Sequence, residues 1–68
     1  MTDTQLLEAM IERSGLKKCA ISERVGIRPQ ALRAKVAGRY EFKQSEIAAL
    51  TDILRLTDDE REQIFFAK

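Results

Sequence analysis

The chain has 68 residues, a formal net charge of +1, 44% hydrophobic residues, one cysteine and no histidine. A chain of this length buries only roughly 60% of its unfolded surface on folding, so we expect one domain, residues 1–68, of modest stability. The single cysteine excludes a disulfide framework, and there is no run of about 18 apolar residues that could span a membrane. No apolar leader follows basic residues at the N-terminus, so we expect a cytoplasmic location without membrane contact.

The first predicted helix lies near the N-terminus, where apolar residues recur at helical spacing over residues 6–11. Thr2 and Gln5 have the spacing of a capping box, a side-chain pair that satisfies free backbone N–H groups where a helix starts. The helix is expected to end near Ser14 and Gly15, because glycine readily takes the left-handed conformation that closes many helices.

Two short helices are predicted on either side of a glycine. The second helix covers residues 17–25 and stops at Gly26, whose conformational freedom permits a tight turn. The third begins at Pro29, since proline suits the first helical position, and ends at Gly38. Ser22 is small where the two helices must cross closely. The apolar residues expected to face the core are Ile21, Val25, Ile27, Leu32 and Val36.

A surface loop and a fourth helix are predicted next. The loop covers residues 39–43, and either Tyr40 or Phe42 is expected to fasten it to the core. The fourth helix covers residues 44–54, whose apolar side chains again recur at helical spacing.

The last predicted helix has the clearest start signal in the chain. Thr57 and Glu60 form a capping box, and the acidic residues of the first turn complement the helix dipole. The helix therefore begins at Asp58 and continues through residues 64–68. No alternation typical of strands is present, so the fold class is all-α: a compact five-helix domain with a helix-turn-helix formed by the second and third helices.

Positive charge is concentrated in the middle of the chain. Residues 13–43 contain nine lysines and arginines against two glutamates, a net charge of +7, whereas residues 1–12 and 44–68 each carry −3. Segregation of this kind creates a local positive field that favours a polyanionic partner. The charge alone also fits a solvated helix surface without a partner.

The exposed face of the third helix is expected to carry Arg28, Gln30, Arg33 and Ala34, and such donors fit a DNA major groove. The segment GLKKCAISERVGIRPQALRAKVAGRYEF (residues 15–42), followed by SEIAALTDILRLTDDE, resembles the lambda-repressor-like family, the Cro/Xre group of bacterial and phage regulators. The resemblance covers nearly the whole chain. It implies a five-helix domain, dimeric on DNA, that places its third helix in the major groove.

The sequence departs from this family at three positions. Lys18 stands where members commonly have glutamine, and Arg28 stands where they commonly have a capping serine or threonine. Pro29 replaces a polar base-reading residue, so base reading is expected of Gln30 and Arg33, with Ala34 against a thymine methyl group. The residues expected to contact DNA phosphates are Lys18, Arg28, Arg39, Tyr40 and Lys43.

Other side chains carry structural expectations. The stem of Lys35 is expected to pack along the edge of the motif with its ammonium group in water, and Glu41 to pair with a nearby arginine. Cys19 is expected to be an inert thiol. Of Phe65 and Phe66, one is expected to close the core and the other to lie in a dimer interface; the alternative is that both pack within the chain.

The leading hypothesis is a sequence-specific regulator of transcription that binds double-stranded DNA as a homodimer, a repressor of the phage or prophage type. The alternative is a protein-interaction module on the same fold, such as an antirepressor or an antitoxin-like partner. The charge of the middle segment favours the first. An enzyme is not expected, because the chain has no histidine, no nucleophile beside a base and no phosphate-binding glycine loop. No cofactor, metal or small-molecule ligand is expected either.

Overall fold

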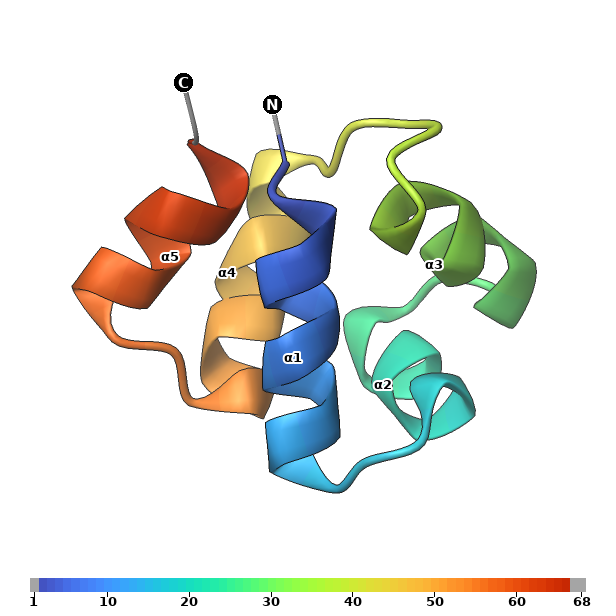
Figure 1. The fold of residues 1–68 in the computed structure, drawn as a ribbon. Helices are drawn as coiled ribbons and strands as arrows, with labels where there is room; N and C mark the ends of the chain where they lie inside the picture. Colours follow the sequence, from blue (N-terminus) through green and yellow to red (C-terminus); the bar gives the residue numbers. More distant parts are fainter. Residues whose placement is uncertain (1, 67–68) are drawn as a thin grey trace.

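Residues 2–66 are described by a computed structural model, in which they fold into α-helices joined by short turns (Figure 1). The helices are α1 (Thr4–Ser14), α2 (Lys18–Val25), α3 (Pro29–Val36), α4 (Gln44–Leu54) and α5 (Asp58–Phe65). The expected all-α fold with five helices is therefore confirmed over these residues, and none of them lies in a strand. Within the same range, no helix is both long and apolar enough to span a membrane.

The N-terminus of α1 differs from the sequence-based prediction. The N-cap residue is Asp3, whose carboxylate accepts a hydrogen bond from the backbone N–H of Leu6 at 3.0 Å. The predicted capping box of Thr2 and Gln5 is wrong, because Asp3 provides a carboxylate acceptor one residue later, where negative charge also suits the helix dipole. The backbone N–H of Asp3 donates to the carbonyl of Ile64 at 2.6 Å, which ties the start of α1 to α5.

The start of α5 agrees with the prediction. The hydroxyl of Thr57 accepts from the backbone N–H of Glu60 at 3.1 Å, and the Glu60 carboxylate accepts from the backbone N–H of Thr57 at 2.9 Å. The helix ends at Phe65. The predicted continuation over residues 67 and 68 lies outside the described residues.

Each helix contributes one completely buried side chain to a single apolar core. These side chains are Leu7, Ile21, Leu32, Leu50 and Ile64, and each has 0% of its surface exposed. Full burial of an aliphatic side chain of this size contributes roughly 1.5–3 kcal/mol to stability. The core therefore holds all five helices together and fixes which face of each helix points outwards.

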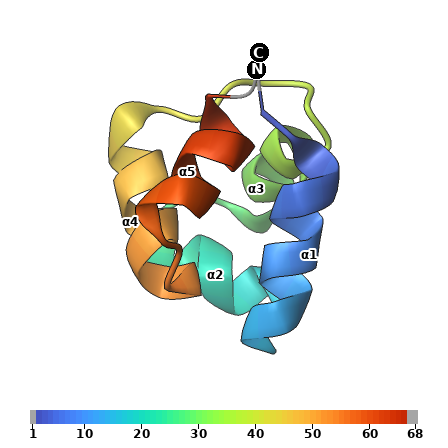
Figure 2. The same ribbon diagram turned by 60° about the vertical axis from the view of Figure 1, so that its left-hand side comes forward.

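The helices are arranged so that α3 and α5 lie on opposite sides of the molecule. Helices α1 and α4 occupy the middle, α5 covers one side, and α2 and α3 cover the other (Figure 1). Figure 2 shows the same arrangement with α5 in front and α3 behind. The exposed surfaces of α3 and α5 therefore face different directions.

Aromatic residues complete the core near the loop between α3 and α4. Phe42 and Phe65 are buried and meet edge to face, with ring centroids 5.5 Å apart. Phe42, not Tyr40, thus fastens the loop, and Tyr40 is 66% exposed. Phe65 is the aromatic residue that closes the core, whereas its neighbour Phe66 is 45% exposed.

The turn from α4 to α5 contains an unusual backbone conformation. Arg55 has φ 53° and ψ 50°, and it is the one non-glycine residue between residues 2 and 66 with a positive φ. A left-handed conformation at such a residue costs roughly 1–3 kcal/mol unless the surroundings compensate it. Here the backbone N–H groups of Arg55 and Leu56 reach back to the carbonyls of Asp52 and Thr51 at 3.3 and 3.0 Å.

Candidate nucleic-acid interface

The turn between α2 and α3 sets the direction of α3. Gly26 has φ 89°, and the carbonyl of Ser22 accepts the N–H groups of both Gly26 and Ile27, at 2.9 and 3.0 Å. An added Cβ at Gly26 would meet no atom within 4 Å, so the position favours glycine for its backbone conformation and not for lack of space. Ser22 is 1% exposed, which agrees with the prediction of a small residue where the two helices cross closely. Its hydroxyl donates a hydrogen bond to the carbonyl of Cys19.

Helix α3 is anchored by two side chains on one face. Leu32 is 0% exposed and Val36 is 3% exposed, so the opposite face of this short helix points to solvent. Pro29 occupies the first turn, and Arg28 is the N-cap residue without a side-chain capping bond, both as predicted. An arginine side chain has no acceptor for a backbone N–H, and Arg28 is exposed and makes no ion pair within residues 2–66, so its guanidinium group is available at the N-terminal end of α3.

A shallow hollow of about 320 Å³ lies on the outward side of α3. Its lining residues, which we call the α3 face, are Gln30, Arg33, Ala34, Ala37 and Arg39. The structure thus brings the three predicted base readers together with one predicted phosphate contact. Sequence reasoning missed Ala37, although it follows Arg33 by four residues and therefore continues the same helical row.

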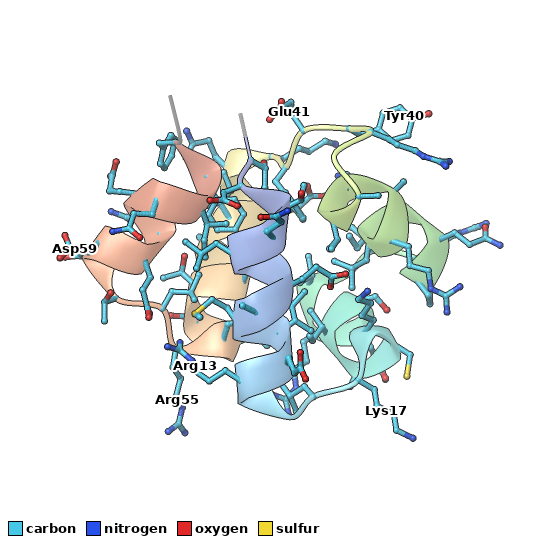
Figure 3. The ribbon with its side chains drawn as sticks, viewed as in Figure 1. Arg13, Lys17, Tyr40, Glu41, Arg55 and Asp59 are labelled. Carbon is cyan, nitrogen blue, oxygen red and sulfur yellow. The ribbon has the colours of Figure 1, made fainter. Side chains whose placement is uncertain are left out.

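The other predicted phosphate contacts surround the α3 face unequally. Tyr40 projects from the loop after α3 into solvent (Figure 3), and Lys43 is exposed at the start of α4. Lys18 lies on α2 and forms an ion pair with Glu8 of α1, with 3.1 Å between Nζ and Oε1. Part of its charge is therefore already compensated within the chain.

Several exposed cations near α3 have no acidic partner. Between residues 2 and 66, ion pairs involve Arg13, Lys18, Lys35 and Arg61. The exposed cations of α2, α3, the turns beside them and the following loop that make no ion pair in this range are Lys17, Arg24, Arg28, Arg33, Arg39 and Lys43. Lys17 was not predicted as a contact. Lys17 projects from the start of α2 (Figure 3). In the sequence it stands beside Lys18, and charge alone does not show which of the two lysines contacts DNA.

Lys35 and Glu46 form a buried ion pair, which corrects the prediction that the Lys35 ammonium group lies in water. Nζ of Lys35 is 2.6 and 2.7 Å from the two carboxylate oxygens, and the side chains are only 14% and 8% exposed. The ammonium group is buried because Lys35 lies on the side of α3 that faces α4, where Glu46 is within reach. The Glu46 carboxylate also accepts the backbone N–H of Lys43 at 2.8 Å. One carboxylate therefore joins the end of α3, the loop and the start of α4.

The same contacts determine the charge of Glu46. Burial by itself raises the pKa of the Glu46 carboxyl group. The hydrogen bonds from Lys35 and from the backbone of Lys43, together with both positive charges, outweigh burial, so the pKa of Glu46 lies below its ordinary value of 4.5. The carboxylate is therefore ionised at neutral pH.

Glu41 and Cys19 are both at the surface. Within residues 2–66 Glu41 makes no ion pair with any arginine, so the predicted pairing is wrong. Glu41 extends from the loop into solvent (Figure 3), where the attraction to a distant arginine is weak. The thiol of Cys19 is exposed on α2 and forms no disulfide.

Comparison with known families agrees with this geometry. Residues 4–64 match the model of a family described as a helix-turn-helix domain. The match covers most of the chain, which therefore belongs to the helix-turn-helix domain family, consistent with the Cro/Xre resemblance. Membership indicates a DNA-binding regulator, and the family is typically non-enzymatic. Searches of curated proteins and of solved structures each gave no match.

The buried ion pair gives a stability prediction. Lys35→Met leaves the Glu46 carboxylate buried without its ammonium partner, so we expect a loss of about 3 kcal/mol at neutral pH. Because the folded pKa of Glu46 is lowered, its stabilising effect is complete above the ordinary value of 4.5 and is lost as the pH falls through the folded value. Urea unfolding at several pH values is expected to show a difference between wild type and Lys35→Met that shrinks in acid.

The double variant Lys35→Met, Glu46→Leu is the matched control. It removes the buried charge altogether, so it is expected to recover part of the lost stability. A Lys35→Met protein whose stability stays within about 0.5 kcal/mol of wild type at every pH would show that the ion pair does not hold α3 to α4.

Proposed function

We propose that this chain acts as one helix-turn-helix domain that regulates transcription by binding specific double-stranded DNA, with α3 in the major groove. The observation that carries the proposal is the α3 face, a hollow lined by Gln30 and Arg33 and bordered by exposed cations without acidic partners. The unpaired cations here flank a helix whose exposed side carries donors for base edges, and this combination favours a nucleic acid over the protein-interaction alternative.

The chemistry of the α3 face suits base edges. Gln30 and Arg33 are three residues apart on the exposed side of one helix, so both side chains can enter the same groove. Arginine pairs with guanine through two hydrogen bonds, and glutamine pairs with adenine in the same way. Ala34 and Ala37 offer methyl groups that fit against thymine methyls and let the helix approach closely.

The cations and the tyrosine hydroxyl around this face suit phosphates. Arg28 stands before α3, Arg39 and Tyr40 follow it, and Lys43 stands before α4, so they flank the helix from both ends. Phosphate contacts position a protein on DNA without reading its sequence. Lys17 joins this set, whereas Lys18 must exchange its ion pair with Glu8 for a phosphate.

We further propose a homodimer. One α3 reads only a few base pairs, whereas two such helices about 34 Å apart read successive major grooves on one side of the duplex. A groove of about 420 Å³ between α4 and α5 supports this proposal, because Ile47, Ala48 and the exposed Phe66 line it. Phe65, the other residue named for the interface, is 5% exposed and belongs to the core, so the proposed interface depends on Phe66. A dimer of this kind would repress transcription by covering promoter DNA, as a repressor of the phage or prophage type acts in the cytoplasm.

Base contacts and phosphate contacts predict different kinds of loss. A preferred duplex is first selected from random DNA and then compared with a scrambled duplex. Arg33→Ala is expected to cost about 1–3 kcal/mol on the preferred duplex and to relax the preference at one base position. Lys43→Ala is expected to weaken binding to both duplexes equally and to reduce the slope of log K against log salt concentration by about one.

The two variants serve as controls for each other. If Arg33→Ala weakens both duplexes by the same factor, then Arg33 contacts phosphate and does not read a base. If neither variant changes binding to either duplex, then α3 does not contact DNA and the protein-interaction alternative becomes the better one.

The proposed dimer is tested by a substitution at Phe66. A substitution at Phe65 would disturb the core and could not separate folding from dimerisation. Phe66→Glu places a charge in the proposed interface while leaving the core intact, so we expect a monomer by sedimentation and weaker binding to a duplex with two half-sites. Gln63→Glu adds the same charge at an exposed position of α5 outside the groove lining and is expected to keep the dimer. A wild-type monomer both free and on DNA would contradict the proposal.

A further inference from the structure

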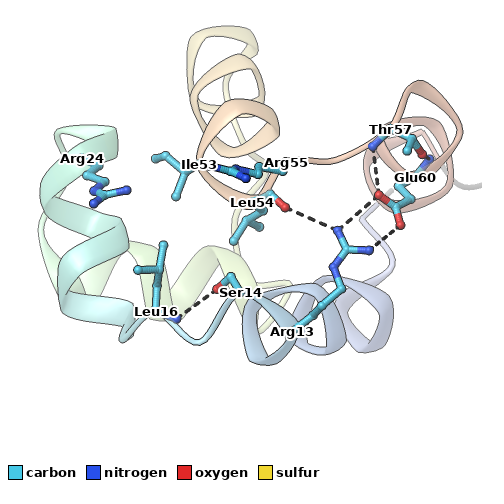
Figure 4. Close-up of a pocket in the computed structure, with 9 residues that line it drawn as sticks. All are labelled: Arg13, Ser14, Leu16, Arg24, Ile53, Leu54, Arg55, Thr57 and Glu60. Carbon is cyan, nitrogen blue, oxygen red and sulfur yellow. Dashed lines mark hydrogen bonds and ion pairs between the residues drawn. The ribbon is translucent and has the colours of Figure 1, made fainter.

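A second cationic surface lies away from the α3 face. The ends of α1 and α4, together with α2 and α5, enclose an open groove of about 540 Å³ (Figure 4). Its lining includes the half-buried apolar side chains of Leu16 and Ile53 and the exposed arginines Arg24 and Arg55. We call this surface the arginine groove. It presents an apolar floor beside two positive charges.

One wall of the arginine groove is fixed by a third arginine. The guanidinium of Arg13 donates to both carboxylate oxygens of Glu60, at 2.7 and 3.3 Å, and to the carbonyl of Leu54 at 3.4 Å (Figure 4). These bonds link the end of α1 to the end of α4 and the start of α5. The wall is therefore formed before any partner arrives, and Arg13 is already occupied.

Arg24 and Arg55, by contrast, make no ion pair with any residue of the described range 2–66. The position of Arg55 is the more informative. Its left-handed backbone, φ 53°, is a conformation that glycine adopts with the least strain, yet the chain has an arginine there. Its side chain projects at the end of the molecule opposite to Tyr40 (Figure 3). The backbone hydrogen bonds of Arg55 and Leu56 hold this turn but do not need an arginine side chain, so the guanidinium group of Arg55 is available to a partner.

We propose that the arginine groove docks an acidic segment of a partner protein. An apolar side chain of that segment covers Leu16 and Ile53, while neighbouring carboxylates pair with Arg24 and Arg55. An apolar floor beside two arginines suits an acidic peptide with an apolar side chain better than a duplex, whose outer surface is lined by charged phosphates. This inference goes beyond the proposed DNA binding, since the groove leaves the α3 face free.

The test uses a phage-displayed library of short random peptides, selected against the immobilised chain. Enriched peptides are expected to combine aspartate or glutamate with a leucine, isoleucine or phenylalanine. A fluorescent copy of one such peptide is expected to lose about tenfold or more in affinity with Arg24→Glu and with Arg55→Glu. Arg33→Glu changes the net charge by the same amount on the α3 face and is expected to retain peptide binding.

A further variant separates docking from folding. Arg55→Gly removes the guanidinium and supplies the residue that the left-handed backbone prefers, so the melting temperature is expected to stay equal or rise while peptide affinity falls. Adding duplex DNA is expected to leave the peptide bound. DNA affinity of the wild type, measured separately, tests the proposed function whatever the peptide result.

Four results would overturn the docking proposal. The first is a selection that enriches no peptide, and the second is enrichment of peptides without acidic residues. The third is an equal loss of affinity with Arg33→Glu and Arg55→Glu, which would indicate attraction to overall charge. The fourth is displacement of the peptide by duplex DNA, which would place the peptide on the α3 face.

Discussion

The left-handed turn at Gly26 is the constraint on which the rest of this structure depends. With φ at 89° and the Ser22 carbonyl closing the end of α2, the chain leaves in one fixed direction, and α3 begins three residues later at Pro29. Complete burial of Leu32 then fixes the rotation of α3 about its own axis. Direction and rotation together decide that Gln30 and Arg33 point outwards. The proposed DNA contact thus follows from one backbone conformation and one buried side chain.

The buried pair of Lys35 and Glu46 holds the other end of α3 in the same frame. Glu46 binds the ammonium group of Lys35 and the backbone N–H of Lys43, so the loop between α3 and α4 is fixed at both of its ends. That loop carries Arg39 and Tyr40. Cations that are held in place lose less conformational entropy when they meet phosphates than cations on a free loop. Even if this buried ion pair adds little to the net free energy of unfolding, it holds the loop that carries Arg39 in position.

The sequence was most informative where the determining interactions are local. The limits of α4 and the cap of α5 are set by residues a few positions apart, and both were predicted correctly. The start of α1 was predicted wrongly because Thr2 and Asp3 can both cap a helix, and the backbone hydrogen bond from Asp3 to distant Ile64 cannot be read from the local sequence. Contacts between residues far apart in the sequence could not be predicted, because they depend on how the helices pack. Lys35 meets a glutamate eleven residues away, and the arginine groove brings Arg24 of α2 together with Arg55 of the turn after α4.

An NMR titration of the isotope-labelled chain with a short DNA duplex tests the central claim, that α3 and its flanking cations form the nucleic-acid interface. The account predicts that amide signals shift most over residues 28–43 and at the start of α2, while signals of α5 and of the arginine groove change little. Even a duplex of arbitrary sequence suffices, because phosphate contacts occur on every sequence. Shifts concentrated on α1 and α5, with residues 28–43 unchanged, would contradict the account.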